Sequence, residues 1–239
     1  MNAFWQDIKH SLRMFWRSPG FTIAAVAALA LGIGTNTAIF SVLNAVLLKP
    51  VPIPEPDRVV LFLNVSPQGS GPAASPAKFA HWSAQTSVIQ DAAAFLTGVV
   101  NLTGSDVPEQ LRSAQVTVNF FRLFGVPVLR GRTFSREEDL PRGEKVVLVG
   151  QALWERRFGG DPQILGKTIS LGGDPYVVIG VVSSKFDFRE FGAQPDVYTA
   201  FQLDPNTSDQ GHYFQAGARL KPGVTLAQAK ERLRASADE

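Results

Sequence analysis

The chain has 239 residues, of which 45% are hydrophobic and 18% are charged, and its net charge is +2. This length accommodates one large or two small folded domains, and the apolar content excludes a disordered chain. The small net charge, carried by dispersed basic residues, argues against nucleic-acid binding, and the absence of cysteine excludes disulfides and thiolate chemistry.

Residues 1–17 are predicted to form a cytoplasmic amphipathic helix that lies on the membrane surface. Apolar residues recur there at helical spacing, and basic residues occupy the other faces. Lys9, Arg13 and Arg17 set the predicted topology, because basic residues beside a membrane span favour the cytoplasmic side. We therefore expect the N-terminus inside the cell and the chain after Lys49 outside.

Residues 18–48 are predicted to form a transmembrane helix. They contain no charged residue, and a bilayer core of roughly 30 Å needs about 20 apolar residues in a helix. Ser18 as N-cap and Pro19 at the first helical position mark its start, and Pro50 stops it. The alternative is a cleavable signal peptide with an A-x-A site at residues 28–30, but the apolar run is too long for one.

Four residues of this helix, Ala24, Ala28, Gly32 and Asn36, recur at intervals of four and share one face. Small residues let two helix backbones approach closely in lipid, and asparagine can hydrogen-bond across the contact. These four residues are therefore a candidate helix-packing seam. An alanine-rich anchor that acquires this spacing by chance is the alternative.

Residues 49–56 alternate proline with other residues, which favours an extended polyproline II linker. A folded domain is expected from Asp57 onward. It opens with a β-rich run at residues 59–65, and Ser75 then caps a helix from Pro76 to about Asp91.

The next stretch, from Phe95 to Val118, is strand-like with predicted breaks at Gly98, Gly104 and Pro108. Residues 120–124 then form a short helix that holds three phenylalanines. We assign these aromatic side chains to the core, and an exposed partner-binding patch is the alternative.

The remaining part of the domain alternates short strands with helices. Residues 146–149 are predicted to be a buried strand and residues 152–158 a helix. Residues 168–171 and 176–182 are predicted to pair as a hairpin around a four-residue loop.

The last predicted elements are a strand at residues 214–220 and a helix that continues to about Arg234. Thr225 and Gln228 form a capping box that starts this helix. Its apolar side chains are expected to pack on the strand at residues 214–220; they are Leu226, Ala229 and Leu233.

Motifs that resemble catalytic or nucleotide sites fail on spacing or context. A Gly-Lys-Thr run at residues 166–168 would need a glycine where Asp161 stands, and it leads into a predicted strand. Ser75 and Lys78 match S-x-x-K, but the companion motifs are missing. The three histidines lie far apart in the sequence. We therefore predict no catalytic, cofactor or metal site and no enzyme activity.

Three long segments carry a family pattern. Residues 11–60 read SLRMFWRSPGFTIAAVAALALGIGTNTAIFSVLNAVLLKPVPIPEPDRVV, residues 118–139 read VNFFRLFGVPVLRGRTFSREED, and residues 146–182 read VVLVGQALWERRFGGDPQILGKTISLGGDPYVVIGVV. In order and spacing they resemble the MacB-like, FtsX-related permeases of ABC transporters, particularly the duplicated orphan permeases.

This resemblance implies an α+β fold in which one N-terminal transmembrane helix precedes a mixed extracytoplasmic domain. A MacB-like periplasmic core domain is expected at residues 57–239. Its porter-like βαβ part would be split between residues 57–114 and 214–239, with an inserted β-rich subdomain at residues 115–213.

The resemblance also implies a function. The chain would be a non-catalytic permease component in the cell (inner) membrane that contacts lipid, a cytoplasmic ABC ATPase subunit, and further permease helices or a second permease copy. Its external domain would handle substrate or relay force from the ATPase. Alternatives are a membrane-anchored binding or sensor module and, less favoured, an anchored periplasmic hydrolase. Because such permeases continue into further helices, we expect a fragment of a longer permease or a truncated gene product.

Overall fold

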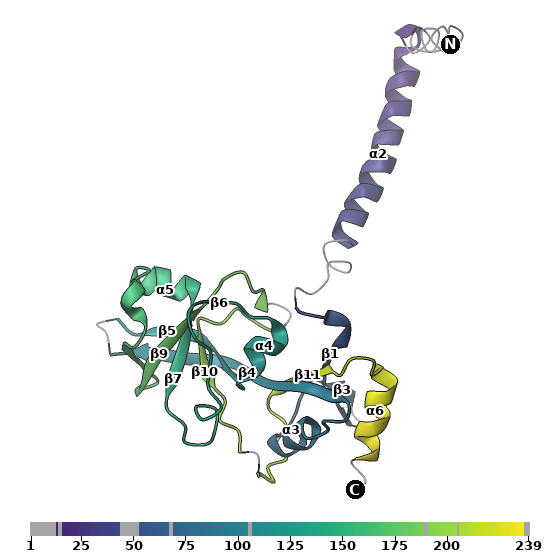
Figure 1. Ribbon diagram of the computed structural model, residues 1–239. Helices are drawn as coiled ribbons and strands as arrows, with labels where there is room; N and C mark the ends of the chain where they lie inside the picture. Colours follow the sequence, from purple (N-terminus) through teal and green to yellow (C-terminus); the bar gives the residue numbers. More distant parts are fainter. Residues whose placement is uncertain are drawn as a thin grey trace. The chain divides into compact units, whose positions relative to one another are not determined.

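The computed structural model describes residues 13, 16–43, 53–66, 69–104, 107–188, 191–204 and 206–236 (Figure 1). The chain divides into two compact units, Met1–Val51 and Pro52–Glu239, which are taken in turn. The first unit contains the apolar helix, and the second contains a mixed α/β domain. The predicted α+β class is therefore confirmed.

The helix α2 (Pro19–Leu43) begins where the sequence predicts. The Ser18 carbonyl accepts a hydrogen bond from the Thr22 amide at 3.1 Å, so the helical ladder starts beside Pro19. Residues 19–41 are long and apolar enough to cross a membrane. The predicted end at Leu48 and most of residues 1–17 lie outside the described residues, although Arg13, Trp16 and Arg17 are helical.

The second unit is built on one mixed sheet in the order β1-β11-β4-β5-β10-β7-β9-β6. Its strands are β1 (Val59–Leu61), β4 (Ile89–Thr103), β5 (Glu109–Val116), β6 (Val128–Gly131), β7 (Val146–Gly150), β8 (Thr168–Leu171), β9 (Asp174–Val182), β10 (Val197–Ala200) and β11 (Gln215–Leu220). The strand β8 pairs with both β4 and β9, which closes β4, β5, β10, β7, β9 and β8 into a ring. A separate small hairpin joins β2 (Asn64–Ser66) and β3 (Gly69–Gly71).

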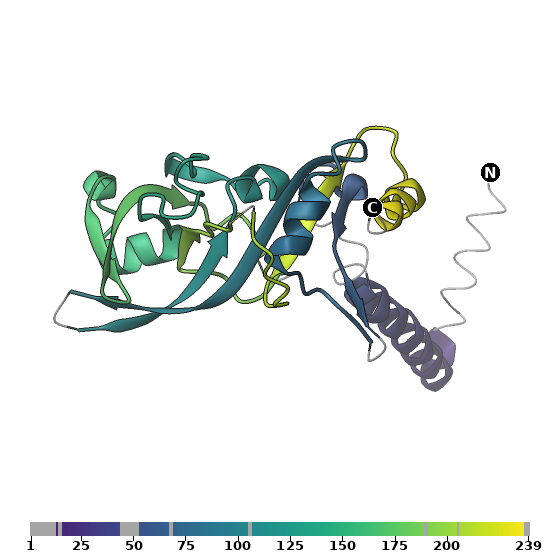
Figure 2. The ribbon, with the colours of Figure 1, turned by 90° about the horizontal axis from the view of Figure 1, so that it is seen from below.

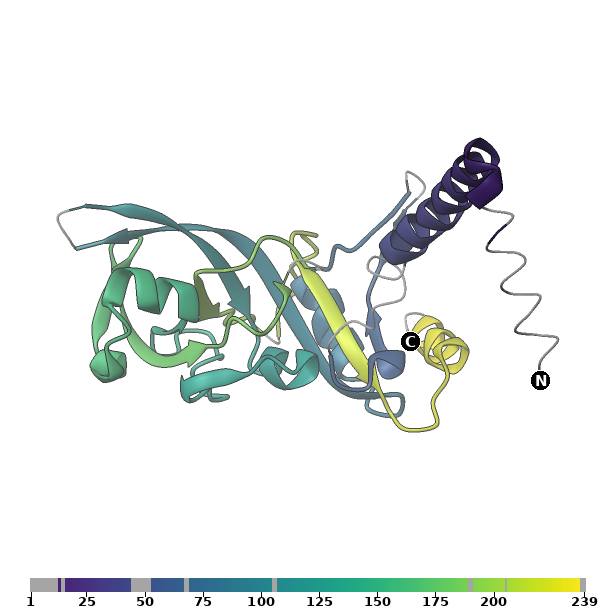
Figure 3. The ribbon, with the colours of Figure 1, turned by 90° about the horizontal axis from the view of Figure 1, so that it is seen from above.

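Helices pack against this sheet. They are α3 (Pro76–Ser83), α4 (Phe120–Phe124), α5 (Gln151–Phe158) and α6 (Leu226–Ala235), with short 3₁₀ turns η2 (Pro56–Arg58) and η3 (Pro162–Ile164). Figure 2 shows α3 against β4 and β11, while β4 and β5 extend side by side away from it. Figure 3 shows β11 crossing in front of α3.

Three hydrophobic clusters form the core. The first gathers Phe120, Phe121 and Phe124 of α4 with Phe95 of β4 and other aromatic rings, so the prediction of core phenylalanines is confirmed. The second takes side chains from all six strands of the ring and from α5. The third lies among α3, β4, β11 and α6. Aromatic rings fill the first cluster because each buries a large apolar area.

The predicted helix from Pro76 to Asp91 is wrong in its second half. Ser75 caps α3 as predicted, because its hydroxyl accepts the Lys78 amide at 3.3 Å, but the helix ends at Ser83. Ile89 instead begins β4 and pairs with Leu220 of β11. The apolar spacing suggested a longer helix, but Ile89 is β-branched and is held in a strand by its pairing with distant β11.

The predicted break at Gly98 is also wrong. This glycine lies within β4 and pairs with Ser113 of β5, so the strand continues for 15 residues. Partners on both sides of β4 hold its backbone extended despite the missing side chain. The run predicted at residues 59–65 is likewise divided, into β1 and β2.

The hairpin of β8 and β9 exists, but its loop has two residues rather than four. Leu171 pairs directly with Asp174, which leaves only Gly172 and Gly173 in the turn. Both have positive φ, at 63° and 94°, as a tight primed turn requires. The sequence analysis placed Asp174 in the loop because aspartate usually favours turns.

The capping box of Thr225 and Gln228 is present at the start of α6, as predicted. Ala229 and Leu233 pack in the third cluster with β11, but Leu226 is 65% exposed and does not. Leu226 is the first residue of the helix, and its side chain lies beyond the contact with the sheet.

The predicted division of the domain at Ala114 falls within β5, and the sheet runs through it without interruption. The porter-like and inserted parts therefore remain a prediction. In contrast, the folded unit begins earlier than Asp57, because Ile53 already packs against the first cluster.

Candidate functional site

The predicted seam residues Ala24, Ala28, Gly32 and Asn36 all lie on α2 and are exposed. Their spacing of four places them along one side of the helix. A methyl group at Gly32 would meet no atom within 4 Å, so this side has room for another helix.

A second row of small residues lies on the same helix. Ala30, Gly34 and Ala38 border a shallow depression that also includes Leu31 and Thr35. This row was not predicted from the sequence, although its residues recur at intervals of four as those of the seam do. Of the predicted topology residues, Arg13 and Arg17 are helical and exposed, and Lys9 lies outside the described residues.

The residues that lead from the predicted linker into the domain are held by a group that we call the linker clamp: Pro54, Glu55, Arg58 and Arg219. Glu55 adopts a left-handed conformation, with φ 48° and ψ 59°, just before Pro56 opens η2. Helical backbone conformations are disfavoured for a residue that precedes proline, so contacts with the rest of the domain must stabilise this bend. The prediction of an extended polyproline II linker at residues 49–56 is therefore wrong for Glu55 and Pro56, because Glu55 is left-handed and Pro56 begins a 3₁₀ turn.

Arg219 provides much of this support. It lies on the central strand β11 and is only 6% exposed. Its guanidinium donates to the Glu55 carboxylate at 3.2 Å, to the Pro54 carbonyl, and to the Leu123 carbonyl at 2.6 Å. A planar guanidinium with five donors can join three acceptors in this way. Arg219 thus ties the linker to both β11 and α4.

Arg58 completes the clamp from the other side of Glu55. Its Nη1 lies 2.8 Å from each Glu55 carboxylate oxygen, and its Nε donates to the Leu220 carbonyl at 2.9 Å. The same side chain contacts Gln90 of β4. Two arginines therefore hold one exposed carboxylate against the end of β11.

Close packing also fixes the linker. Gly125, which ends α4, has φ 67°, and a Cβ atom there would lie 2.5 Å from the Pro54 Cδ atom. Only glycine fits both the backbone conformation and this close approach. The Pro54 ring therefore rests directly on the end of α4.

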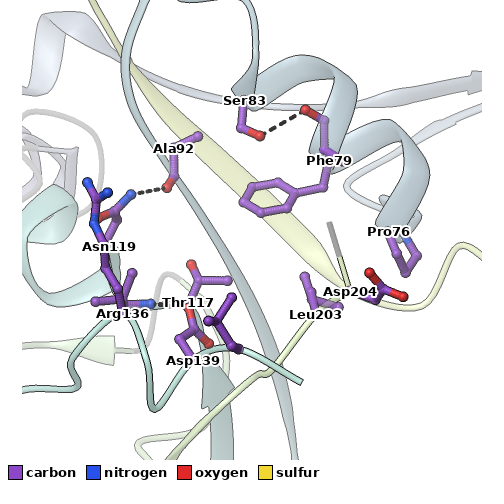
Figure 4. A pocket seen from close by; sticks show the side chains of 13 residues that line it. Pro76, Phe79, Ser83, Ala92, Thr117, Asn119, Arg136, Asp139, Leu203 and Asp204 are labelled. Atoms are coloured by element: carbon purple, nitrogen blue, oxygen red, sulfur yellow. Dashed lines mark hydrogen bonds between the residues drawn. The ribbon is translucent and has the colours of Figure 1, made fainter. Parts of the chain in front are cut away.

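A second feature, which we call the α3 hollow, is a cavity of about 310 Å³ beside α3. Apolar side chains form most of its wall, and Figure 4 shows the Phe79 ring between Asp204 on one side and Asn119 and Arg136 on the other. The lining residues come from five separate segments: Pro76, Phe79, Ala80, Ser83, Ala92, Thr117, Val118, Asn119, Arg136, Asp139, Leu140, Leu203 and Asp204.

Asp139 is the least exposed charged group of the hollow. Its Oδ2 accepts the Val118 amide at 2.7 Å, and its Oδ1 accepts the Gln202 amide at 3.1 Å. Burial raises the pKa of the Asp139 carboxyl, and these N–H groups oppose that rise. Asp139 therefore ties three chain segments together at the base of the hollow.

A basic depression adjoins the hollow and shares Val118, Asn119 and Arg136 with it. It adds Arg122, Phe121, Val126 and Thr133, and none of the described residues that line it is a carboxylate. Arg122 donates to the buried Asp91 carboxylate at 2.9 Å and to Asn119. Arg136, between the two cavities, has no ion pair among the described residues.

Neither the linker clamp nor the α3 hollow was predicted from the sequence. Their residues are far apart in the chain, and only sheet pairing brings them together. Arg219 gave the one available signal, because it is the charged residue of a strand that is otherwise uncharged, and a charged residue buried in a sheet must be paired. No comparable pattern marks the hollow.

The residues of the two rejected motifs make contacts within the fold. Lys167 pairs with Asp161 at 2.6 Å at the entrance to a strand, not at the start of a helix. Lys78 donates to Asn64 at 2.7 Å, while Ser75 caps α3. Within the described part of the chain, no group of three His, Asp or Glu side chains is arranged to hold a metal ion.

Comparison with known proteins is consistent with this architecture. Among curated proteins, the chain is similar to the "Macrolide export ATP-binding/permease protein MacB" of Hahella chejuensis, with 31% identity over 102 residues. That alignment covers 39% of this chain and 15% of the relative, so the chain spans a small part of that protein.

Solved structures share the fold. The periplasmic region of MacB from Actinobacillus actinomycetemcomitans matches with a TM-score of 0.59 at 17% identity, covering 78% of this chain and 85% of that one. A domain of a putative permease from Porphyromonas gingivalis gives 0.60 at 18% identity, covering 78% and 82%. The extracellular domain of the noncanonic ABC-type transporter YknZ from Gram-positive bacteria gives 0.54 at 16% identity, covering 73% and 88%.

The family comparison is decisive because it covers most of the chain. Residues 22–236 match the family described as the MacB-like periplasmic core domain, which confirms the resemblance found in the sequence. The chain therefore belongs to the MacB-like periplasmic core domain family.

Proposed function

We propose that this chain is a non-catalytic permease component of an ABC-type transport system in the cell membrane, whose external domain relays force from a separate cytoplasmic ATPase. Family membership and the apolar helix α2 support this assignment. The proposed topology places the N-terminus in the cytoplasm and residues 52–239 outside.

The observation that carries the proposal is the linker clamp. A relay needs a stiff connection where the chain enters the external domain, because a flexible connection would dissipate a displacement. Arg219 joins the linker to α4 and β11, and Arg58 joins it to the end of β11. The buried guanidinium of Arg219, which donates to three acceptors at once, holds such a geometry in place.

Partners follow from the same proposal. One apolar span cannot enclose a transport path, so further permease helices or a second permease copy would pack beside α2. The seam of Ala24, Ala28, Gly32 and Asn36 is the proposed contact, since small residues permit close helix approach in lipid. An ABC ATPase would bind on the cytoplasmic side.

The experiment uses the full chain in nanodiscs, with its ABC ATPase identified by copurification from native membranes. The chain lacks cysteine, so spin labels can be placed at two chosen positions, Ser41→Cys and Glu155→Cys. We expect ATP to change the distance between the labels. In Arg219→Gln this change is lost while ATP hydrolysis continues, because the clamp no longer transmits the displacement.

Arg112→Gln is the matched control, because Arg112 also pairs with a carboxylate, that of Asp196 at 3.3 Å, but lies outside the clamp. It should respond to ATP as the unmodified chain does. Failure of any ABC ATPase to associate, or a label distance that is the same with and without ATP, would overturn the proposal.

A membrane-anchored binding or sensor module is the second candidate, and the α3 hollow is the observation that favours it. An anchored hydrolase has less support, because the hollow combines carboxylates and an arginine without a nucleophile paired to a base. ATP-dependent movement of the external domain would favour the permease over both.

A further inference from the structure

We propose that the α3 hollow and the adjoining basic depression together bind a small zwitterionic molecule with an apolar side chain, of the class of short apolar peptides. Its ammonium group would lie at Asp204, its carboxylate at Arg136, and its apolar side chain against Phe79. This inference concerns ligand binding and is independent of the force relay.

The arrangement of charge suggests a ligand that carries both signs. Asp204 and Arg136 both line the hollow and lie on opposite sides of the Phe79 ring (Figure 4). Beyond Arg136 the depression contains Arg122 and no lining carboxylate, whereas the hollow itself contains Asp139 and Asp204. One end is thus acidic and the other basic, which is complementary to a zwitterion.

Hydrogen-bond capacity at the two ends is still available. Arg136 is exposed and makes no ion pair among the described residues. Asp204 accepts one hydrogen bond, from the Asn206 amide to Oδ1 at 2.9 Å. A guanidinium has five donors and a carboxylate about four acceptor positions, so each can bind a ligand charge without losing a present contact.

The other polar side chains that line the hollow are already hydrogen-bonded within the protein. Asp139 accepts two amides, Thr117 bonds the Ala94 backbone, and the Asn119 side chain donates to the Ala92 carbonyl at 3.2 Å. The surface of the hollow that is left for a ligand is therefore mainly apolar. The side chain of a ligand would therefore be recognised by burial and not by further hydrogen bonds.

The size of the site limits the ligand. The hollow has a volume of about 310 Å³, at the lower end of the range of about 300–1,000 Å³ for small-molecule sites. Phe79, Ala92 and Leu203 provide room for one apolar side chain. A dipeptide fits this description better than a long polymer, which would extend beyond both charged ends.

The test is isothermal titration calorimetry on the full chain in nanodiscs with four forms of the dipeptide glycyl-phenylalanine, which has one apolar side chain. These are the free peptide, the N-acetylated form, the C-amidated form and the form blocked at both ends. Each block removes one charge and leaves the apolar body intact. We expect each single block to weaken binding about tenfold, because one charge-assisted hydrogen bond contributes on that order.

Two variants assign the ends. Arg136→Gln should weaken binding of the free peptide about tenfold and abolish the difference between the free and C-amidated forms, while the effect of N-acetylation persists. Asp204→Asn should do the converse. Arg142→Gln and Asp174→Asn are matched charge controls, because both residues are exposed and neither lines the site; they should bind like the unmodified chain.

Equal binding of all four peptide forms would overturn the proposal, as would the absence of binding at about millimolar peptide. An equal response of the controls and the two site variants would also overturn it. Unchanged thermal unfolding midpoints of all four variants establish that the domain is folded in each titration. Absence of the ATP-dependent change in label distance in the unmodified chain, with peptide binding retained, would contradict the relay alone.

Discussion

Gly125→Ala is predicted to destabilise the external domain by displacing the linker. The new Cβ atom would lie 2.5 Å from the Pro54 Cδ and 2.7 Å from its Cγ, well inside contact distance. The backbone there has φ 67°, which alone costs a non-glycine residue about 1–2 kcal/mol. Overpacking adds about 1–3 kcal/mol, so the total is about 2–5 kcal/mol.

Gly159→Ala separates these two contributions. Gly159 ends α5 with φ 62°, almost the same conformation, but a Cβ atom there meets nothing within 4 Å. It should therefore cost only the backbone part, about 1–2 kcal/mol. The difference between the two variants measures the contact between Pro54 and the end of α4.

The assay is urea unfolding of the full chain in detergent micelles, followed by the fluorescence of Trp82 and Trp154 in the external domain. A Pro54→Ala background removes the two ring atoms that clash. Gly125→Ala in that background should cost about as much as Gly159→Ala. If the two glycine variants destabilise equally, or if Pro54→Ala relieves nothing, the contact between linker and α4 does not hold the domain.

Three further predictions address the core, the surface and the membrane helix. Tyr198→Phe should leave stability unchanged or raise it by about 1 kcal/mol in the same urea assay, because the Tyr198 hydroxyl is buried with no partner among the described residues; a clear loss would mean that this hydroxyl is hydrogen-bonded. Glu138→Gln should reduce the decrease in unfolding free energy that occurs on acidification. Arg132, at 2.6 Å, lowers the pKa of the folded Glu138 carboxyl, so the stabilisation is present above the unfolded pKa and is lost as the pH falls through the folded pKa. An unfolding free energy with the same dependence on acidic pH in the variant would contradict this. Gly32→Leu should weaken association of α2 with other helices, measured by crosslinking in membranes, without reducing insertion, whereas Ile33→Leu should have no effect.

Local chemistry explains which elements could be predicted from the sequence. Ser18 and Pro19 mark the start of α2, and the Thr225–Gln228 capping box marks the start of α6. Both starts could be predicted because the residues that determine them lie within one helical turn of each other. The phenylalanines of α4 were correctly placed in the core for a similar reason. Three large aromatic side chains in five residues have few favourable places other than an interior.

The errors arise where distant pairing decides the structure. Ile89 continues a helical pattern but lies opposite Leu220, and Gly98 looks like a break but is paired with Ser113. Neither partner can be identified from nearby residues. The linker was misassigned for the same reason, since alternating prolines favour an extended chain until Arg219, more than 160 residues later, binds the Pro54 carbonyl and Glu55.

The strand β4 links the linker clamp to the ring of strands. Its first half, from Ile89 to Phe95, pairs with β11, which carries Arg219. Its far end, at Leu102 and Thr103, pairs with β8 and closes the ring. Fifteen extended residues at about 3.3 Å each span about 50 Å. Because β5 pairs with β4 from Phe95 to Leu102, the strand is supported on one side or the other along its length. In the proposed relay, a displacement of Pro54 would pass to the ring through this hydrogen-bonded strand. Pairing of Gly98 with Ser113 would then supply the stiffness that the glycine backbone lacks.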